Sequence, residues 1–384
     1  MGLELVHIVD EQTAEDAARL CSLLLHKLPT AEVQQSVVVM GRHPAGLIVP
    51  DGIARQQLGR PMLGGRVLSA TQLNRKLAEL HPNALLAYSG FAAAATAACS
   101  QRVSMTAIVA DPGEVAETSR WLTGYGGPID VVCLSGMVQR RLVERGVPLV
   151  ATAVIRPGVD FGEIRRARES FDRSGMDLPT EGRGRVMVTL SPPSRAGGQY
   201  YAVWAVAILH HIWPDAVLVV PGCSREQGRI GRLIDTIYCP QAYRLTEDRY
   251  SLAELLSVAD AVLVPALADD SMDGAAGGLA TGVGGLAWAM GAGVPIIGSA
   301  VPSVTEYVTD GQTGFLCRPG EPHTLAIRIR SAFESADKLQ SCVQAARHQA
   351  YENFCSERCI ESFMKLIQNM AARRPALAGI GSAC

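Results

Sequence analysis

Short apolar runs alternate with segments of helical period along most of the chain. Leu3–Val9 is an apolar run that predicts a buried strand, and Ser36–Met40 predicts a second one. Between them, Thr13–Lys27 carries Ala, Leu and Cys at helical spacing behind Asp10 and Glu11, which we take as an acidic N-terminal cap. A strand, a helix and a strand in this order imply two parallel strands joined by a helical crossover.

The alternation continues through the first half of the chain and predicts a doubly wound α/β domain. The stretch 46–66 is rich in Gly, Pro and Arg, so we expect a loop with one short element inside it. The remaining predicted elements are helices at Ala70–His81, Phe91–Cys99 and Val138–Arg145, and strands at Ala84–Tyr88, Thr106–Val109, Val131–Leu134 and Ala153–Ile155.

A charged, Gly-bearing stretch without apolar period separates this domain from a second one. We therefore predict an N-terminal domain over 1–164, a linker over 165–185, a second domain over 186–350, a last helix over 351–370 and a frayed tail over 371–384. The second domain is predicted to have strands at Val186–Leu190, Ala216–Val220, Ala242–Leu245, Ala261–Val264 and Val294–Gly298, and helices at Gln199–His211, Gln227–Ile237, Leu252–Val258, Leu286–Met290, Pro322–Phe333 and Leu339–Met370.

Composition fits two domains and argues against some classes of function. The chain has 384 residues, too many for one ordinary core, and its apolar fraction of 48% can fill two. The formal net charge of -2 gives no concentrated basic face, so we expect no binding of nucleic acid.

The ten cysteines lack paired CxxC spacing, so we expect buried, reduced thiols in a cytoplasmic protein. The start MGLELVHIVDEQ lacks the pattern of a signal peptide, and no window is long and apolar enough to span a membrane. Contact with a membrane surface stays open. His210 and His211 point about 100° apart on a helix and cannot chelate one ion together, so no metal site is predicted.

The densest pattern lies in residues 269–322. A Gly-crowded loop leads into the helix at Leu286–Met290, and a tight turn, the strand Val294–Gly298, a second short helix and a Thr-Asp-Gly turn follow. A loop that feeds a helix N-terminus on an α/β core is suited to binding an anion.

This stretch closely resembles the C-terminal signature of family-4 glycosyltransferases of the GT-B fold. The element IDVVCLSGMVQRRLVERGVP and the turn Arg156–Asp160 also resemble parts of that family. The resemblance implies two Rossmann-like doubly wound domains facing across a cleft, with the last helix crossing back to the first domain. It further implies transfer of a sugar, hexosyltransferase-type, from a nucleotide-sugar donor with retention. No cofactor is required, and a divalent metal is not expected.

The resemblance covers geometry better than chemistry. The two glutamates of the family, eight residues apart, correspond to Ala280 and Trp288. The Arg and Lys that contact the diphosphate in the family correspond to Pro192 and Gly197. Family glycines before the second short helix are replaced by Pro302 and Ser303, and the Gly-Gly acceptor loop is replaced by residues 10–13, where acidic groups would repel a diphosphate unless paired.

Several residues could still hold the donor diphosphate through backbone amides and arginines. Arg195 could reach the phosphates from the first loop of the second domain, although an exposed arginine is the commoner outcome. The Gly run 273–285 could cradle phosphate or could be a flexible insertion. Trp288 could stack on a base or fill space, and Glu306 matches a family glutamate but could also cap a helix. The donor-binding candidates are Arg195, Gly198, Arg225, Gly282, Gly284, Gly285, Trp288 and Glu306, and the weak catalytic candidates are Asp273 and Asp111.

Two functions follow from this pattern. The first is a retaining glycosyltransferase with an unknown acceptor. The second is a catalytically silent GT-B relative, kept as a binding or partner subunit after losing the paired glutamates and the phosphate-binding cations. A nucleotide-sugar epimerase or a phosphorylase of the same fold is a third, more distant reading. The oligomeric state, the donor base and the sugar are not encoded in any pattern that we recognise.

Overall fold

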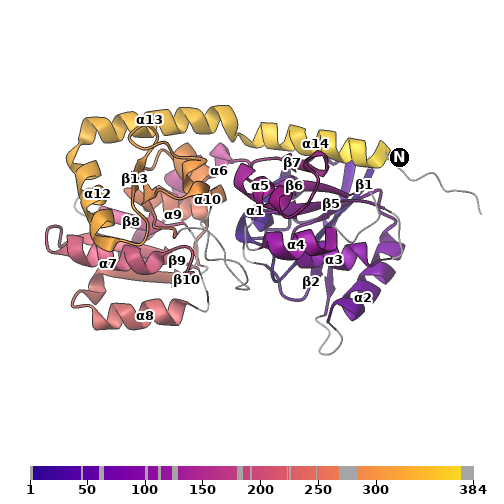
Figure 1. The fold of residues 1–384 in the computed structure, drawn as a ribbon, viewed down its shortest axis with the longest axis horizontal. Coiled ribbons are helices and arrows are strands. Elements are labelled where there is room, and N and C mark those ends of the chain that lie inside the picture. The colour runs from indigo at the N-terminus through magenta and orange to yellow at the C-terminus, as the bar shows by residue number, and fades with distance from the viewer. Residues whose placement is uncertain are drawn as a thin grey trace, which may run out of the picture. The chain divides into compact units, whose positions relative to one another are not determined.

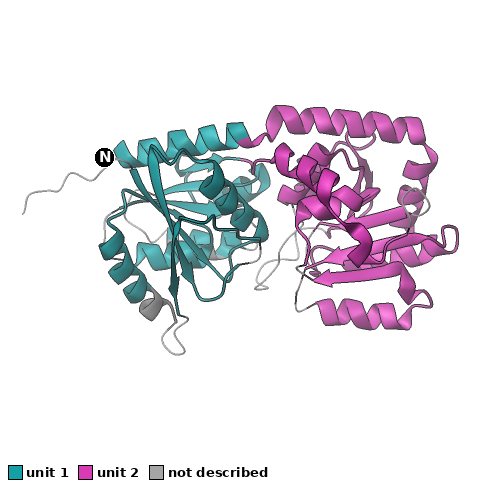
Figure 2. Ribbon diagram, turned by 180° about the vertical axis from the view of Figure 1, so that it is seen from behind, with its two compact units in different colours: residues 1–110, 114–155, 357–384 teal, residues 111–113, 156–356 magenta. Residues whose placement is uncertain are grey.

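The computed structural model describes residues 3–44, 46–59, 65–99, 103–110, 114–122, 129–179, 185–190, 193–222, 224, 226–247, 249–267 and 283–372. Figure 1 shows the helices and strands of these ranges. The chain divides into two compact units, coloured separately in Figure 2. The first unit contains residues 1–110, 114–155 and 357–384, and the second unit contains residues 156–356.

The first unit is built on a parallel sheet that has seven strands within the described residues, in the order β3-β2-β1-β4-β5-β6-β7. The order reverses between β1 and β4, as in doubly wound sheets. The strands are β1 (Leu3–Asp10), β2 (Val33–Met40), β3 (Ala54–Leu58), β4 (Ala84–Ala87), β5 (Ser104–Val109), β6 (Ile129–Cys133) and β7 (Thr152–Val154).

Helices cover this sheet because each turns an apolar stripe towards it. Leu73 and Leu77 of α2 pack with Ile8 and Leu85 in one buried cluster, together with alanines of α3. The helices of the first unit are α1 (Glu15–Lys27), α2 (Gly65–Leu80), α3 (Gly90–Ala97), α4 (Val115–Leu122), α5 (Gly136–Glu144) and most of α14 (Ser356–Ala372), and a short 3-10 turn, η2 (Leu149–Ala151), precedes β7.

The second unit repeats the plan with a parallel sheet in the order β10-β9-β8-β11-β12-β13. Within the described residues it has six strands, whose central members are fully buried apolar runs, as expected for a sheet covered on both faces. The strands are β8 (Arg185–Thr189), β9 (Ala216–Pro221), β10 (Tyr243–Glu247), β11 (Ala261–Val264), β12 (Ile296–Ser299) and β13 (Phe315–Cys317).

Two apolar clusters fix the layers of the second unit. Buried side chains of α7, α8 and α12 pack with Met187 and Leu218 on one face of the sheet, and those of α6, α9, α10 and α13 pack with Val262 and Val264 on the other. The helices are α6 (Phe161–Ser170), α7 (Gln199–His210), α8 (Gln227–Thr236), α9 (Leu252–Val258), α10 (Val283–Ala292), α11 (Pro302–Thr305), α12 (Pro322–Glu334) and α13 (Ala336–Asn353), with 3-10 turns η3 (Arg173–Met176) and η4 (Pro240–Ala242).

Several elements differ from the sequence prediction, among them β13, which lies where no strand is predicted. Helix α4 lies between β5 and β6, where no helix is predicted. Helix α6 occupies part of the stretch 165–185 that is predicted as a linker, because Asp160 caps it and Ile164 and Ala167 are buried. The single helix predicted over Leu339–Met370 is wrong: α13 ends at Asn353 and α14 begins at Ser356.

The break between α13 and α14 has a clear cause. The Val159 N–H donates to the Phe354 carbonyl at 2.7 Å, and the Ser356 N–H donates to the Val159 carbonyl at 3.2 Å. The backbone around Phe354 is thus used for a bridge to another segment instead of for continuing the helix.

Candidate functional site

The second sheet has one topological switch point, between β8 and β11. Chain connections leave in opposite directions from these neighbouring parallel strands, and ligands of doubly wound sheets bind beyond the carboxyl ends of such strands. Thr189 ends β8 and Val264 ends β11, so the segments that follow these two residues form the candidate site.

Gly198 joins the two segments. It has a φ of 66°, and a Cβ added to it would lie 1.9 Å from the Pro265 carbonyl oxygen. Beside it, the Leu267 N–H donates to the Ala196 carbonyl at 2.8 Å. Only glycine combines this left-handed backbone with so close an approach. The loop after β8 is therefore fixed against the segment after β11.

Two helices begin near this junction. Helix α7 starts at Gln199, directly after Gly198. Helix α10 starts at Val283, and a Cβ added to its Gly285 would lie 3.2 Å from the Leu190 Cβ, just beyond β8. The first-turn N–H groups and the positive dipole ends of α7 and α10 thus gather at the carboxyl edge of β8. Such an arrangement favours an anion.

The loop before α7 is held by the Gln199 side chain, which is 2% exposed. Its Oε1 accepts from the Ser194 N–H at 3.0 Å, and the Ser194 Oγ accepts from the Gly197 N–H at 2.8 Å. A Cβ on Gly197 would lie 2.6 Å from both polar atoms of the Gln199 amide. The amide therefore fills the space beside position 197, the position that the sequence resemblance aligns with a family lysine.

Arg195 projects from the same loop, and its side chain is 79% exposed. Its Nε lies 3.6 Å from the Glu226 Oε1, and the Arg229 Nη1 lies 3.5 Å from the Glu226 Oε2. The Arg229 guanidinium also lies 5.3 Å from the centre of the Tyr200 ring. Two arginines and one carboxylate thus cluster beside the start of α7, with the Arg195 guanidinium directed towards solvent.

Ser224 ties this cluster to the neighbouring strand. Its Oγ donates to the Pro193 carbonyl at 2.5 Å and accepts from the Glu226 N–H at 3.2 Å. The segment after β9 and the loop after β8 are therefore one hydrogen-bonded unit. Sequence reasoning missed Ser194, Gln199, Ser224 and Glu226; a polar side chain directly after the glycine that opens α7 was the available signal for Gln199.

Two other predicted donor residues have partners that the sequence did not indicate. Trp288 is 8% exposed and packs in the cluster of α9, α10 and α13, which corresponds to the space-filling alternative and disfavours stacking on a base. Glu306 is the C-cap residue of the short helix α11, so it lies at the end of a helix and not at its start. Its carboxylate lies 3.3 Å from the Arg156 guanidinium.

The structure describes two of the remaining predicted site residues. Gly284 and Gly285 lie in the first turn of α10. Asp111, Asp273, Arg225 and Gly282 lie outside the described residues.

The corresponding edge of the first sheet carries a buried carboxylate. Asp10 ends β1 and is 1% exposed. It accepts from the Ser89 hydroxyl and from the Gln12 N–H at 2.7 Å, and Ser89 also caps α3 by accepting from the Ala92 N–H at 2.9 Å. Burial raises the pKa of Asp10, and these hydrogen bonds oppose the rise. The cap predicted for α1 is wrong, because its N-cap is Ala14 and Asp10 is engaged with Ser89.

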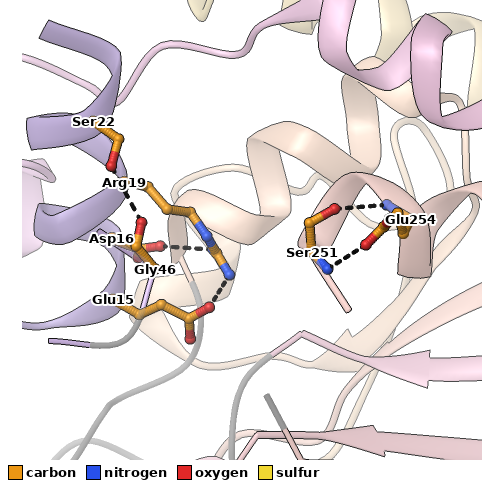
Figure 3. A network of polar contacts seen from close by, with 7 residues as sticks. All are labelled: Glu15, Asp16, Arg19, Ser22, Gly46, Ser251 and Glu254. Atoms are coloured by element: carbon orange, nitrogen blue, oxygen red, sulfur yellow. Dashed lines mark hydrogen bonds and ion pairs between the residues drawn. The ribbon is translucent and has the colours of Figure 1, made fainter. Parts of the chain in front are cut away.

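Helix α1 fixes the segment that follows β2. The Ser22 Oγ donates to the Gly46 carbonyl at 3.2 Å and accepts from the Ile48 N–H at 2.7 Å. Figure 3 shows Ser22 with Gly46, and Arg19 of the same helix paired with Glu15 and Asp16. Figure 3 also shows the capping box that starts α9, in which Ser251 and Glu254 exchange hydrogen bonds with each other's backbone.

Within the described residues, no cluster of three or more His, Cys, Asp and Glu side chains could hold a metal ion. The described helices include none that is long and apolar enough to cross a membrane.

Comparisons with known proteins agree with this architecture. Residues 198–349 match the model of the family "Glycosyl transferases group 1", a range that begins at Gly198 and includes Glu226, α10 and Glu306. A comparison with curated protein sequences gave no match.

Solved structures match over nearly the whole chain. HepE of Anabaena, in complex with UDP and glucose, has a TM-score of 0.74 at 16% identity and covers 94% of this chain and 99% of its own. Sucrose-phosphate synthase of Thermosynechococcus elongatus has a TM-score of 0.73 at 15% identity, covering 96% and 99%. A glycosyltransferase of Rickettsia africae has a TM-score of 0.69 at 13% identity, covering 97% and 100%. The chain therefore has the GT-B fold, with two parallel-sheet α/β domains.

Proposed function

We propose that this chain is a glycosyltransferase of group 1 that takes a sugar from a nucleotide-sugar donor and transfers it, with retention, to an acceptor that is not yet known. The donor diphosphate binds at the carboxyl edge of β8 and β11, in the second unit. The observation that carries this proposal is the junction at Gly198, where α7 and α10 both begin beside the switch point.

Two further observations support the proposal. The family model covers the junction and both helices. HepE, which has the same fold, was crystallised with UDP and with UDP-glucose. In our proposal the backbone N–H groups of α7 and α10 stabilise the charge that grows on the leaving diphosphate, and Arg195 adds a cation. Family-4-like chemistry, the retained anomeric configuration and a cytoplasmic location belong to this proposal.

A catalytically silent relative is the second candidate, and one observation favours it. The neutral Gln199 amide occupies the space that a lysine would need at position 197. A charge-assisted hydrogen bond from lysine to phosphate is therefore absent, and Gln199 could offer only a neutral hydrogen bond in its place. Each charge-assisted hydrogen bond contributes about 1.5–3 kcal/mol, so the loss weakens donor binding by about tenfold or more. Loss of the paired glutamates adds to this effect on turnover.

Thermal unfolding with nucleotides tests the proposal. UDP, GDP, ADP and their sugar conjugates are each added with and without Mg²⁺. A ligand at a hundred times its Kd adds about 2.7 kcal/mol of stability, which raises the Tm by about 5–10 °C. If none of these compounds shifts the Tm, the chain binds no donor of this class and the transferase proposal is wrong.

An arginine variant with a matched control tests the site. Arg195→Ala should weaken binding of the stabilising nucleotide by about tenfold, because a charge-assisted contact is lost. Arg330→Ala is the control, since Arg330 of α12 lies 3.6 Å from Glu334 and so forms an arginine–glutamate pair of the same length as Arg195 with Glu226. Binding of a nucleotide sugar without any cleavage of its sugar–phosphate bond would favour the silent relative over the enzyme.

A further inference from the structure

We propose that Glu226 is the residue that binds the ribose of the donor nucleotide and makes the site selective for ribonucleotides. This inference rests on the proposed function, because it assigns one part of the same ligand. It begins from topology. In dinucleotide-binding doubly wound sheets the phosphates lie at the helix after the first strand, and an acidic side chain about 20 residues further on accepts a hydrogen bond from the ribose. In the second unit, β8 is the first strand and β9 the second.

Glu226 is an acidic side chain in the segment that follows the second strand. It follows β9 and is the N-cap residue of α8. The hydrogen bonds of Ser224 to Pro193 and to the Glu226 N–H join its backbone to the loop that opens α7. The backbone that carries the carboxylate is therefore held beside the proposed phosphate site.

The surroundings of the carboxylate leave room for a ligand. Its side chain is 30% exposed, and Arg195 and Arg229 approach one oxygen each, at 3.6 Å and 3.5 Å. These are ion-pair separations longer than a normal hydrogen bond. A carboxylate has about four acceptor positions, so capacity remains for two hydroxyl donors. The two arginines leave hydrogen-bonding positions of the carboxylate open, and ribose hydroxyls are donors of matching chemistry.

The burial of Trp288 strengthens the assignment. Position 288 corresponds to one of the two glutamates of the family that the sequence resembles, and the buried indole ring of Trp288 cannot accept a hydrogen bond from a hydroxyl. A ribonucleotide held at this edge needs an acceptor from elsewhere. Among the residues joined to the α7 loop by the contacts above, Glu226 is the carboxylate that can supply it.

A rival reading makes Glu226 only a partner that holds the two arginines. The two readings predict different effects of the ribose hydroxyls of the nucleotide on its affinity for the Glu226 variants. If Glu226 only holds Arg195 and Arg229, its removal changes affinity for ribonucleotides and deoxyribonucleotides by the same factor. If Glu226 binds the ribose, its removal changes the ratio of the two affinities.

The experiment measures that ratio by calorimetric titration of the full chain. UDP, GDP and ADP are each compared with their 2′-deoxy and 3′-deoxy forms, on the wild type and on the variants Glu226→Ala and Glu226→Gln. The wild type should prefer the ribonucleotide by about tenfold over at least one deoxy form, as expected for a carboxylate–hydroxyl hydrogen bond. In Glu226→Ala the preference should fall to less than about twofold.

Glu334→Gln is the matched control, because Glu334 also lies 3.6 Å from an arginine and belongs to α12. It should keep the wild-type preference. A preference that survives in both Glu226 variants, or that is absent from the wild type while the ribonucleotide binds, overturns the assignment and leaves the proposed function intact. If no nucleotide binds any variant, the proposed function itself fails. Equal Tm values of the unliganded proteins establish that the variants are folded.

Discussion

Gly198 lies directly against the carbonyl oxygen of Pro265, so closely that a Cβ at position 198 would come within 1.9 Å of it. The oxygen belongs to the backbone and cannot rotate away as the end of a flexible side chain could. The contact joins the loop after β8 to the segment after β11, and it places the start of α7.

Gly198→Ala should therefore destabilise the second unit. The left-handed φ of 66° costs about 1–2 kcal/mol for alanine, and the steric overlap adds about 1–3 kcal/mol. The sum of about 2–5 kcal/mol corresponds to a fall in Tm of about 4–20 °C. Gly231→Ala is the control, because Gly231 lies inside α8 with nothing within 4 Å of an added Cβ. That variant should be unchanged or slightly more stable, and equal losses in both variants would contradict our account of Gly198.

Ser89→Ala should destabilise the first unit more than an ordinary loss of a helix cap. Ser89 caps α3 and also donates to the buried Asp10, so its removal costs both interactions, about 2–3 kcal/mol in urea unfolding. Ser135 caps α5 by accepting from the Val138 N–H at 3.2 Å, and Ser135→Ala should cost about 1 kcal/mol. If the two variants lose the same unfolding free energy, the hydrogen bond from Ser89 to Asp10 contributes nothing to stability.

His7 should make the first unit sensitive to acid. Burial lowers the pKa of His7 from 6.5 to about 4, while its hydrogen bond with Gln35 acts in the opposite direction. The unfolded chain therefore binds more protons than the folded chain between these pH values. The stability from neutral His7 is complete above pH 6.5 and is lost progressively as the pH falls towards 4.

At pH 5 the loss should be about 2 kcal/mol relative to pH 7.5. Glutamine does not titrate, so the stability of His7→Gln should lack this part of the pH dependence. The difference in unfolding free energy between wild type and His7→Gln therefore separates the contribution of His7 from that of other titrating groups. Urea unfolding at both pH values measures the effect. Parallel pH profiles of wild type and His7→Gln would show that His7 is not the responsible group.

Arg156 and Glu306 should be energetically coupled. The Glu306 side chain is only 11% exposed, so removal of the Arg156 guanidinium leaves a largely buried carboxylate with less compensation. Arg156→Ala should cost about 1–2 kcal/mol, and Arg156→Ala combined with Glu306→Gln should cost less than the sum of the single variants. Chemical unfolding of the four proteins gives the coupling energy. Strict additivity would mean that the pair contributes nothing to stability.

Much of the architecture could be predicted from the sequence because parallel sheets bury continuous apolar runs. Leu252–Val258 and Ala261–Val264 have the predicted ends, since a Ser–Glu capping box and an apolar run mark them locally. Non-local causes explain the failures. Val159 interrupts the last helical segment at Phe354 from almost two hundred positions away. Helix α1 begins only at Glu15, so Asp10 lies too far before it to act as its cap and bonds with Ser89 of another segment.

The candidate site was predictable in position but not in composition. Gly198 follows from the resemblance and from the switch-point rule, whereas α10 begins at Val283, three residues before the predicted start at Leu286. The pairing of Arg195 with Glu226 depends on two segments that Ser224 brings together, and no local pattern marks such a contact. The packing of Trp288 likewise depends on helices that are distant in sequence.

The packing beside Gly197 limits which side chains fit at this position. A lysine there would meet the Gln199 amide at 2.6 Å and the Ser194 Oγ at 2.8 Å, so both side chains would have to move and the hydrogen bond between these two residues would be lost. A cation engineered at position 197 therefore requires Gln199 to rearrange or to be replaced. A cation at position 195, where the Arg195 side chain is 79% exposed, needs no such rearrangement.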